Sequence, residues 1–409
     1  MNALRVLTFV MAGGQGERLR PFTRDYAKPA LPFGGGYRII DFVLSNLYNS
    51  GLPQACVLLQ YRPSLLAQHI ARHWSGVRGA NGRFVRALLP RSAGVERFHG
   101  TANSVACGLR AIDGAQPDVI AVFAADHVYR MDVRQMLAFH RERDAEVTVA
   151  AAPVPLARAS AFGVIRADSD GRILGFQEKP DRPQPRPDDP RRAFASMGNY
   201  LFQPDALRTA LAEAQARGEH DFGRHVLPRM VEAHRAFAYD FARNRVPGAR
   251  PDEEAAYWRD VGTVDAYVEA QWDLLGPAPR FRLDNREWPI RCGDAPRVLG
   301  SLDGGELEHS IIGPGVQFQG AAVRHSVLQR GAHVEPGAEI ERCILMEGVR
   351  VANGVCLSRA IVGRGNVLTA QTQARSGRRA RSSGWSRSPA GMTIVPPRAR
   401  RAAQAPGRA

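Results

Sequence analysis

The sequence predicts an α/β domain with a mainly parallel sheet, followed by a parallel β-helix. From about residue 5 to residue 270, short apolar runs alternate with helical patterns, which is typical of crossover units on a parallel sheet. Beyond residue 299 a short motif recurs every 16 or 17 residues, the pattern of a stacked coil. With 409 residues and 44% hydrophobic side chains, the chain is long enough to fold as two such domains.

The first domain is expected to span residues 1–275. Buried strands are predicted at residues 4–11, 54–60 and 118–124, and helices at 39–48, 64–73 and 103–112. Two later strands at 173–178 and 193–202 are joined by a proline-rich loop, and a helix at 264–275 closes the domain. Ligands of open α/β sheets bind beyond the carboxyl ends of the strands, where a glycine-rich turn and Asp126 both fall.

A linker at residues 276–298 leads to the repeat domain, which is expected at residues 299–368. Each repeat has a small residue, two aliphatic residues and then a turn glycine, and the four repeats begin at Ser310, Ser326, Cys343 and Ala360. Stacked coils of this length bury their aliphatic residues in a shared core. Residues 369–409 are rich in Arg, Ser, Pro and Gly, so we expect them to be poorly ordered, with residues 392–395 as the one stretch able to add a terminal strand.

The net charge of +15 suggests a polyanionic partner, but its distribution argues against one. Nine of the 55 basic residues lie after residue 370, where no acidic residue occurs, so the rest of the chain is only mildly basic and we expect no nucleic-acid partner. Only two of the basic residues are lysines, Lys28 and Lys179. Because a compact ammonium and a broad guanidinium are not interchangeable at a tight anion site, both lysines are candidate site residues.

The cysteines and the apolar runs indicate the cellular compartment of the protein. The five cysteines are scattered without C-x-x-C spacing, which predicts neither a disulfide framework nor a zinc site and fits a cytoplasmic location. No run approaches ~20 apolar residues, and the first apolar run opens directly into glycines. We therefore expect neither a membrane association nor a cleaved leader.

The strongest local signal is the sequence A-G-G-Q-G-E-R-L at residues 12–19, directly after the first strand. Its glycines let backbone N–H groups approach an anion, and Arg18 supplies a guanidinium for phosphate oxygens. It is not a dinucleotide fingerprint, since Leu19 stands where the third glycine belongs, and no P-loop motif occurs. Taken alone, the turn favours a purely structural role, and a phosphate site needs support from elsewhere in the sequence.

This turn and the A-K-P motif that contains Lys28 together resemble the signature of sugar-nucleotide pyrophosphorylases. Further segments resemble one branch of that group, the glucose-1-phosphate adenylyltransferases: R-I-I-D-F at 38–42, E-K-P at 178–180, S-M-G at 196–198, H-D-F-G at 220–223 and Y-W-R-D-V-G-T at 257–263. The resemblance spans roughly residues 5–368. It implies a Rossmann-like nucleotidyltransferase domain, a left-handed β-helix, and transfer of the adenylyl group of ATP to glucose 1-phosphate for glycogen synthesis, in a homotetramer tuned by small metabolites.

The resemblance also implies roles for single residues. Catalysis would involve Arg18, Lys28 and Asp126, while Asp126 and Asp260 would bind Mg²⁺. ATP would be bound by Ala12, Gly13, Gly14, Gly16, Phe98, Gly100 and Thr101. Glucose 1-phosphate would be bound by Gly163, Glu178, Lys179, Ser196, Asp221 and Trp258. Arg24 is a candidate for binding an effector. Taken singly, these residues also have structural interpretations. Asp221 could be a helix N-cap, and Glu178 and Lys179 could form a solvated ion pair.

Several positions depart from the family pattern. Glu17 stands where the glycine loop usually has threonine, so its carboxylate must point outward or meet the metal or Arg18. Ala125 replaces a glycine, and R-S-A at 91–93 replaces a glutamine-containing segment, which leaves adenine recognition open. Two alternatives therefore stand beside the main hypothesis: an enzyme that uses another nucleoside triphosphate, and a weakly catalytic regulatory subunit of a mixed oligomer.

Overall fold

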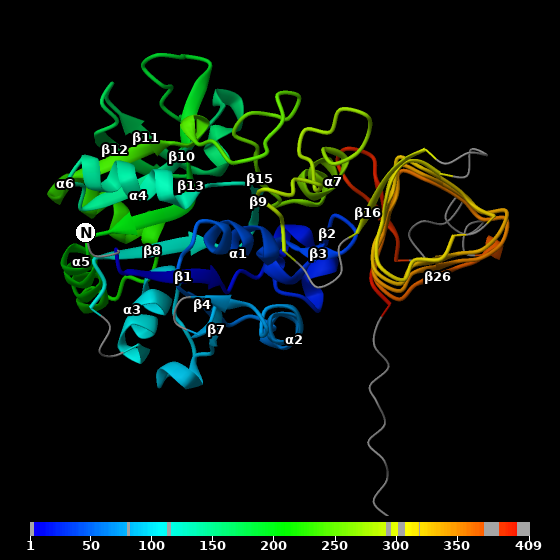
Figure 1. The fold of residues 1–409 in the computed structure, drawn as a ribbon, viewed down its shortest axis with the longest axis horizontal. Helices are drawn as coiled ribbons and strands as arrows, with labels where there is room; N and C mark the ends of the chain where they lie inside the picture. The colour runs from blue at the N-terminus through cyan, green and yellow to red at the C-terminus, as the bar shows by residue number, and fades with distance from the viewer. Residues whose placement is uncertain are drawn as a thin grey trace, which may run out of the picture.

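The computed structural model describes residues 4–79, 82–112, 116–291, 296–301, 307–318, 320–371 and 384–398. Figure 1 shows two parts, a layered α/β body and a triangular coil viewed along its axis. A single hydrophobic cluster runs through both parts and joins Phe33 and Leu274 of the body to Ile311 of the coil. The two domains therefore pack against each other through apolar side chains.

The central sheet of the body has nine strands, of which β7, β4, β1 and β8 lie side by side and parallel. Strand β13 joins β8 in the antiparallel sense, β11 and β12 follow, and β10 pairs with both β13 and β14. The bounds are β1 (Val6–Ala12), β4 (Ala55–Leu59), β7 (Val85–Leu88), β8 (Val119–Ala124), β10 (Val147–Pro155), β11 (Gly163–Ala167), β12 (Ile173–Glu178), β13 (Arg192–Phe202) and β14 (Ala236–Asp240).

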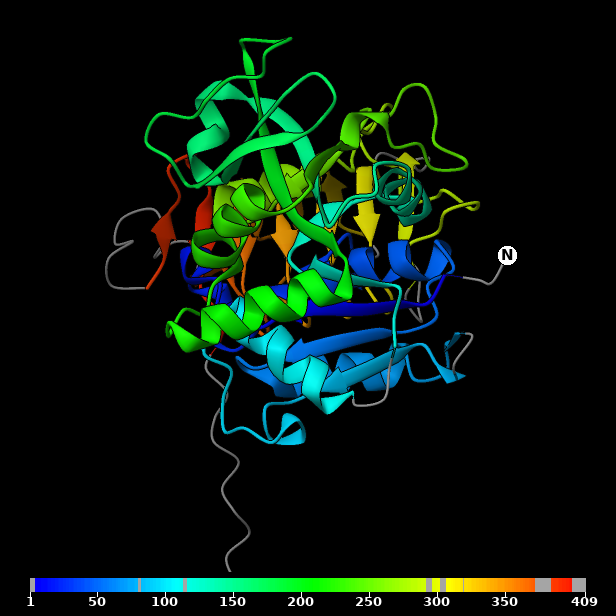
Figure 2. The same cartoon turned by 90° about the vertical axis from the view of Figure 1, so that its left-hand side faces the viewer.

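Helices cover both faces of this sheet, as Figure 2 shows. Along β1, Phe9 and Val10 point into different cores, since successive side chains of a strand face opposite ways. The Val10 face packs against α1 and the Phe9 face against α3, which explains why the strand is one continuous apolar run. The helices are α1 (Ile39–Asn49), α2 (Pro63–His73), α3 (Thr101–Ala111), α4 (Val133–Glu142), α5 (Pro204–Ala216), α6 (Leu227–Ala233) and α7 (Val264–Trp272).

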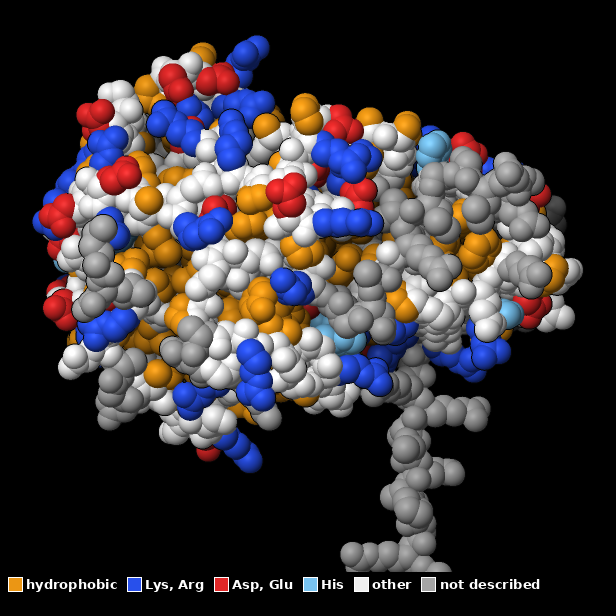
Figure 3. All heavy atoms as spheres, in the orientation of Figure 1, with side chains coloured by type: hydrophobic (Ala, Val, Ile, Leu, Met, Phe, Trp, Pro, Cys, Tyr) orange, Lys and Arg blue, Asp and Glu red, His pale blue; other side chains and the backbone are white. Residues whose placement is uncertain are grey.

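The predicted elements of the body are confirmed to within about two residues, except that the last helix ends at Trp272 and is shorter than expected. Short helical turns separate them: η1 (Glu17–Leu19), η2 (Phe22–Arg24), η3 (Lys28–Ala30), η4 (Arg91–Ala93), η5 (Leu156–Ala161), η6 (Phe222–Val226) and η7 (Phe241–Arg243). Within the described residues, none of the helices has the length and apolar character needed to cross a membrane. On the face shown in Figure 3, basic and acidic side chains are interspersed over the body.

Three small sheets complete the body. Strand β9 (His127–Tyr129) pairs with β15 (Trp258–Asp260), β2 (Pro32–Phe33) with β3 (Tyr37–Arg38), and β5 (Arg78–Gly79) with β6 (Gly82–Arg83). The sequence patterns gave no sign of these two- and three-residue strands. The β9 and β15 pair matters most, because it joins segments that lie far apart in the chain.

The coil is built from short parallel strands stacked one repeat above another. They are β16 (Arg297–Ser301), β17 (Leu307–Ile312), β18 (Ala322–Arg324), β19 (Val327–Leu328), β20 (His333–Val334), β21 (Glu339–Glu341), β22 (Ile344–Leu345), β23 (Arg350–Val351), β24 (Cys356–Ser358), β25 (Ala360–Val362), β26 (Val367–Leu368), β27 (Ser386–Arg387) and β28 (Thr393–Val395). Two of these strands are antiparallel to their neighbours: β16 pairs with β17, and β27 pairs with β28.

Each residue type of the repeat has its own physical role. The first aliphatic residue, such as Ile311, packs against the α/β body, while the second, such as Ile312, lies inside the coil. The small residue hydrogen-bonds to the next coil: the backbone N–H of Ser326 donates to Oγ of Ser310, and that of Cys343 donates to Oγ of Ser326. The coil therefore buries its aliphatic residues on two faces, one internal and one toward the body.

Within residues 369–409, for which the sequence left a terminal strand open at 392–395, the structure has strands β27 and β28. Strand β28 pairs in parallel with β25, so that Ile394 lies beside Ile361 and Val395 beside Val362. This register places Val395 in the coil core and Ile394 in the cluster shared with the body, which continues the pattern of the repeats. Residues 372–383 and 399–409, which carry most of the arginines of this segment, lie outside the described residues.

Glu347 forms a polar connection between the two domains. Its carboxylate accepts hydrogen bonds from Tyr26 Oη and Arg38 Nη2, both at 2.8 Å, and both donors belong to the body. We expect Glu347→Ala to destabilise the protein by roughly 2 kcal/mol, because both donors lose their acceptor in a partly buried place. The melting temperature measured by calorimetry should fall by a few degrees, while Glu341→Ala at an exposed position of the same coil should leave it unchanged. An unchanged value for Glu347→Ala would contradict this role.

Candidate active site

The glycine loop follows β1 and turns sharply at Gly16. Gly16 has a φ of 64°, and a Cβ there would lie 3.0 Å from Thr23 and 3.1 Å from Lys28, so only glycine fits without strain. Gly13 and Gly14 are exposed, whereas Ala12 is buried at the strand end. The Glu17 carboxylate points outward, with 70% of its side chain exposed and Arg20 Nη2 at 3.8 Å. The sequence left open whether Glu17 points outward or meets the metal or Arg18, and in the structure it points outward.

Lys28 lies between two carboxylates. Its Nζ is 2.9 Å from Oδ2 of Asp126 and 2.7 Å from Oδ1 of Asp260. Asp126 follows the end of β8, and Asp260 ends β15, which pairs with β9 so that His127 and Asp260 face each other. Only 6% of the Lys28 side chain is exposed, against 31% for Asp126 and 16% for Asp260. Three predicted residues from distant parts of the chain therefore meet at one point.

The two carboxylates keep Lys28 charged. Burial disfavours the ammonium, but the charges of Asp126 and Asp260 outweigh this effect and raise the pKa of Lys28. Burial likewise opposes the ionised form of Asp126, but Lys28 and His127 hold the pKa of that carboxyl below its ordinary value. The site therefore combines a buried ammonium, Lys28, with the carboxylates of Asp126 and Asp260.

His127 adjoins the carboxylates and was missed by the sequence reasoning as a site residue. Its Nε2 lies 3.6 Å from Asp126 and 3.9 Å from Asp260, and its ring packs edge-on against Trp258 at a centroid distance of 5.1 Å. Donor atoms of these three polar residues all lie within 4.8 Å of one another. The two carboxylates supply the oxygen ligands that a hard divalent cation prefers, so the residues fit a metal such as Mg²⁺. The D-H pair in the sequence was the available signal.

Beside the glycine loop lies a cavity of about 260 Å³. Asp126 lies at one side of it, and Gln60 and Phe98 line another. Gln60 was missed by the sequence reasoning; its Oε1 accepts a 2.6 Å hydrogen bond from the backbone N–H of Phe98, so the two lining residues hold each other in place. The remaining lining residues are Met11, Gly13, Gly14, Pro29, Leu58, Gly100, Thr101, Ser104 and Ala124.

Arg18 lies on the other side of the carboxylates. A Cβ placed on Gly262 would lie 2.8 Å from Nη2 of Arg18 and 3.0 Å from Oδ2 of Asp260. The guanidinium and the carboxylate therefore both lie against Gly262, which leaves room for them because it has no side chain. Arg18 is itself exposed, so its guanidinium is accessible to a ligand.

Glu178, Lys179 and Gly163 form a second group of predicted residues. Gly163 and Glu178 are partners on the β11 and β12 ladder, and a Cβ on Gly163 would lie 3.0 Å from the Glu178 carboxylate. Lys179 Nζ is 3.2 Å from Glu178, and Lys179 has a φ of 50°, a strained conformation for a residue with a side chain. The Lys179 side chain is 54% exposed, so this ammonium is available to a ligand.

Asp221 is held near Glu178 and Thr101. Its Oδ1 accepts from the backbone N–H of Arg224 at 3.0 Å, so the N-cap role that the sequence left open is present. Its Oδ2 accepts from the Thr101 hydroxyl at 3.3 Å, which links a residue predicted for ATP to one predicted for the sugar. Both Glu178 and Asp221 lie close to Gly223, where a Cβ would be 2.7 Å and 3.5 Å from their carboxylates.

The other predicted residues lie at the edges of this arrangement. Ser196 Oγ is 3.4 Å from the Tyr200 hydroxyl, and Trp258 is buried between His127 and Phe162. Arg24 is exposed on η2 and does not line the cavity of about 410 Å³ between the two domains. That cavity is lined instead by three other arginines, Arg38, Arg72 and Arg330.

Comparisons with known proteins agree with both halves of the chain. Residues 7–276 match the nucleotidyl transferase family, and residues 300–395 match the GlmU-like C-terminal hexapeptide family. The chain is 45% identical to a glucose-1-phosphate adenylyltransferase of Thermodesulfovibrio yellowstonii over 89% of each chain. It is 44% identical to the enzyme of that name from Corynebacterium jeikeium over 87% of this chain and 89% of the relative, and 39% identical to glucose-1-phosphate adenylyltransferase 1 of Vibrio vulnificus over 90% and 92%.

Proposed function

Because the chain belongs to the glucose-1-phosphate adenylyltransferase family of nucleotidyltransferases, we propose that it makes ADP-glucose and pyrophosphate from ATP and glucose 1-phosphate. The predicted family and fold class, a nucleotidyltransferase domain followed by a left-handed β-helix, are confirmed. The observation that carries the mechanism is the meeting of Lys28, Asp126 and Asp260 beside the glycine-loop cavity.

The reaction needs two phosphorylated substrates in line. An oxygen of the phosphate of glucose 1-phosphate forms a bond to the α-phosphorus of ATP, and the bond from that phosphorus to the bridging oxygen breaks and releases pyrophosphate. The attacking phosphate is already ionised, so no general base is required. Positioning and neutralisation of charge therefore supply most of the catalysis.

The family uses a divalent metal, and we propose Mg²⁺ held by Asp126 and Asp260. Bound there, the ion would neutralise phosphate charge and fix the triphosphate. Lys28, which lies within hydrogen-bonding distance of both carboxylates, would turn toward the oxygens of the triphosphate, and Arg18 would approach them from the side of Gly262. The backbone N–H groups of Gly13, Gly14 and Gly16 would cradle the same phosphates.

The base and the sugar would occupy opposite sides of the carboxylates. The cavity lined by Phe98, Gly100 and Thr101 would take the adenine, with the Gln60 amide donating to the ring. On the other side Lys179 would bind the phosphate of glucose 1-phosphate. The sugar hydroxyls would then contact Glu178, Asp221, Ser196 and the Gly163 backbone, against the ring of Trp258.

A substitution of Lys179 tests the sugar side. We expect Lys179→Ala to raise the KM for glucose 1-phosphate by roughly 10- to 100-fold and the KM for ATP by less than threefold, because an ammonium bound to a phosphate contributes about 1.5–3 kcal/mol. Arg191→Ala in the neighbouring loop, whose side chain is 92% exposed, serves as the control and should change neither value. Equal increases for both substrates would contradict the assignment of Lys179 to the sugar phosphate.

A nucleotide-by-nucleotide assay tests the activity itself. Purified protein with Mg²⁺ and glucose 1-phosphate should release pyrophosphate faster with ATP than with UTP, dTTP or GTP. A faster rate with another nucleotide would show that the enzyme prefers that nucleotide to ATP. If none of the nucleotides supports pyrophosphate release, the regulatory-subunit alternative is favoured. The outward orientation of Glu17 and the assembled carboxylates argue against that alternative.

We further propose a homotetramer in the cytoplasm that supplies ADP-glucose for glycogen synthesis. The family resemblance supports the tetramer and the pathway. Within the described part of the chain, Cys56, Cys107 and Cys343 are buried free thiols, which supports a reducing compartment. Light scattering on the purified protein measures the oligomer directly. The effector role of Arg24 also stays a prediction, and an unchanged effector response in Arg24→Ala would remove it.

A further inference from the structure

A buried asparagine, Asn199, hydrogen-bonds to both ends of the turn that contains Asp126. Asn199 lies on β13 opposite Phe123 of β8, and its side chain has no exposed surface. Its Oδ1 accepts a 3.3 Å hydrogen bond from the backbone N–H of Ala124, the last residue of β8. Its Nδ2 donates a 3.0 Å hydrogen bond to the hydroxyl of Tyr129, the last residue of β9. One side chain therefore connects the residue at which the turn begins to the residue at which it ends.

The sheet itself leaves a gap at this place. Pairing between β13 and β8 ends with Asn199 and Phe123, because the next residue, Gly198, has a φ of 70° and turns β13 away. Gly198 passes so close that a Cβ there would lie 2.9 Å from the Cβ of Ala124. The register of β13 and β8 thus stops before Ala124, and a buried N–H without a partner is costly. The Asn199 amide supplies the missing acceptor.

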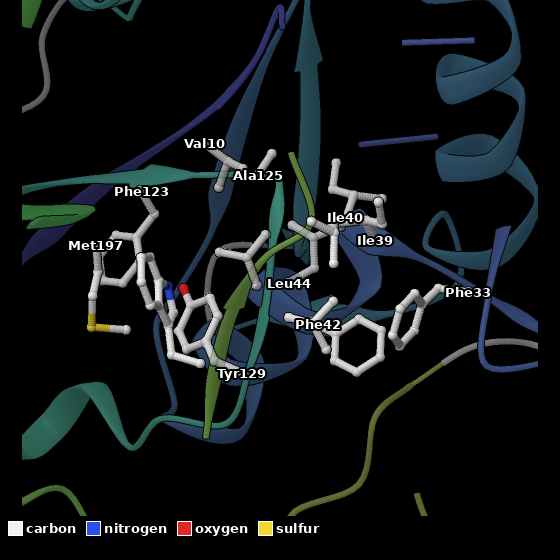
Figure 4. Packing of buried hydrophobic residues seen from close by; sticks show 14 of the residues in the cluster. Val10, Phe33, Ile39, Ile40, Phe42, Leu44, Phe123, Ala125, Tyr129 and Met197 are labelled. Atoms are coloured by element: carbon white, nitrogen blue, oxygen red, sulfur yellow. The ribbon is translucent and has the colours of Figure 1, made fainter. Parts of the chain in front are cut away.

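The other end of the turn is equally fixed. Tyr129 is fully buried and belongs to the same hydrophobic cluster as Phe123, Ala125 and Met197, part of which Figure 4 shows. Its backbone carbonyl accepts from Nδ2 of Asn46 at 3.1 Å, while its hydroxyl meets Asn199. Between these anchors stand Asp126 and His127, whose side chains enter the active site. Movement of either anchor would change the distance from Asp126 to Lys28.

We propose that Asn199 is a positioning residue for adenylyl transfer, which sets the place of Asp126 and hence the affinity of the site for its metal. This inference rests on the proposed function, since it concerns the same carboxylates. It assigns no contact with substrate to Asn199. Partners of metal-binding groups act in this way, and their loss costs roughly 10- to 100-fold in metal affinity or activity.

The chain offers a matched control for a merely structural role. Asn244 is also buried, accepts from the backbone N–H of Asp132 at 2.9 Å and donates to the hydroxyl of Tyr239 at 2.9 Å. It therefore makes the same two kinds of hydrogen bond as Asn199. Asp132 is the N-cap of α4 and Tyr239 lies on β14, and neither belongs to the group formed by Asp126, His127 and Asp260. Loss of either asparagine should weaken the fold, but only loss of Asn199 should alter the metal site.

The experiment compares Asn199→Leu and Asn244→Leu in the full-length protein. Mn²⁺ alone is titrated and followed by electron paramagnetic resonance, and pyrophosphate release is measured as a function of Mg²⁺. For Asn199→Leu we expect Mn²⁺ to bind roughly 10-fold more weakly and kcat to fall roughly 10-fold, with both substrate KM values changed less than threefold. For Asn244→Leu we expect a lower melting temperature but Mn²⁺ binding within twofold of the parent protein.

A milder variant covers the case in which Asn199→Leu does not fold. Tyr129→Phe removes only the hydroxyl, and we expect it to weaken Mn²⁺ binding about threefold. Unchanged Mn²⁺ binding in Tyr129→Phe and in a folded Asn199→Leu would overturn the proposal, and so would an equal loss in Asn244→Leu. If the parent protein binds Mn²⁺ but releases no pyrophosphate with any nucleotide, the proposed function fails while the role of Asn199 is still decided by the Mn²⁺ titration.

Discussion

Asp260→Asn is expected to slow pyrophosphate release by about a thousandfold. Asparagine keeps the size of the side chain but removes the charge that lies 2.7 Å from Lys28 and that would hold the metal. A preorganised charge at a phosphoryl-transfer site contributes up to about 4 kcal/mol to the transition state, which corresponds to a factor of about a thousand. The measurement is kcat at saturating ATP and glucose 1-phosphate over a range of Mg²⁺ concentrations, since part of the loss should be a higher Mg²⁺ requirement.

Glu17→Gln is the control for this prediction, because it removes a carboxylate from the same neighbourhood. Glu17 is exposed and points away from the site, so its removal should change the rate less than threefold. An Asp260→Asn variant that keeps more than a tenth of the parent rate would contradict the proposed metal role of Asp260. A tenfold loss in Glu17→Gln would mean that Glu17 turns inward when substrates bind.

The identity of the site residues could be predicted from sequence motifs, but their convergence could not. Lys28 lies 98 residues before Asp126 and 232 residues before Asp260. The last two meet because β9 pairs with β15, and these strands have only three residues each, too few for a periodic pattern. The motifs therefore indicated which side chains matter, and tertiary pairing decided how they meet.

The missed residues show what motif reasoning does not reach. Gln60 and Asn199 each complete a backbone hydrogen bond, at Phe98 and Ala124, where regular pairing ends. Such roles depend on where a strand turns away, which a single sequence does not encode locally. The repeat gives a similar case: the motif predicted buried aliphatic residues, but only the packed domains reveal that Ile311 faces the body while Ile312 faces the coil.

Most basic positions of this chain are arginines, and the structure gives a physical reason why Lys28 is a lysine. Lys28 Nζ donates to two carboxylates at 2.9 and 2.7 Å in a place that is almost closed to water. A planar guanidinium is broader and could not take that point without moving one carboxylate. Lys179 is more than half exposed, and its compact charge would matter only toward a ligand. The two lysines therefore provide a matched pair for separating catalysis from stability.

Lys28→Met is expected to lower kcat by 100- to 1000-fold and to make folding stability depend on Mg²⁺. Methionine is of similar length but leaves the two carboxylates without their shared cation, and breaking a buried ion network in this way costs about 3–5 kcal/mol. A divalent cation between the carboxylates would offset this repulsion. Calorimetry should therefore show a lower melting temperature without Mg²⁺ and a partial recovery with it, larger than any Mg²⁺ effect on the parent protein.

Lys179→Met separates this effect from a general loss of a lysine. Because the Lys179 side chain is 54% exposed and forms a surface ion pair with Glu178 at 3.2 Å, its removal should impair use of glucose 1-phosphate but leave the melting temperature unchanged with or without Mg²⁺. Recovery of Lys28→Met with Mg²⁺ but not with the same concentration of a monovalent salt would assign the effect to the two carboxylates. A Lys28→Met variant whose melting temperature ignores Mg²⁺ would show that Asp126 and Asp260 do not hold the ion in the free enzyme.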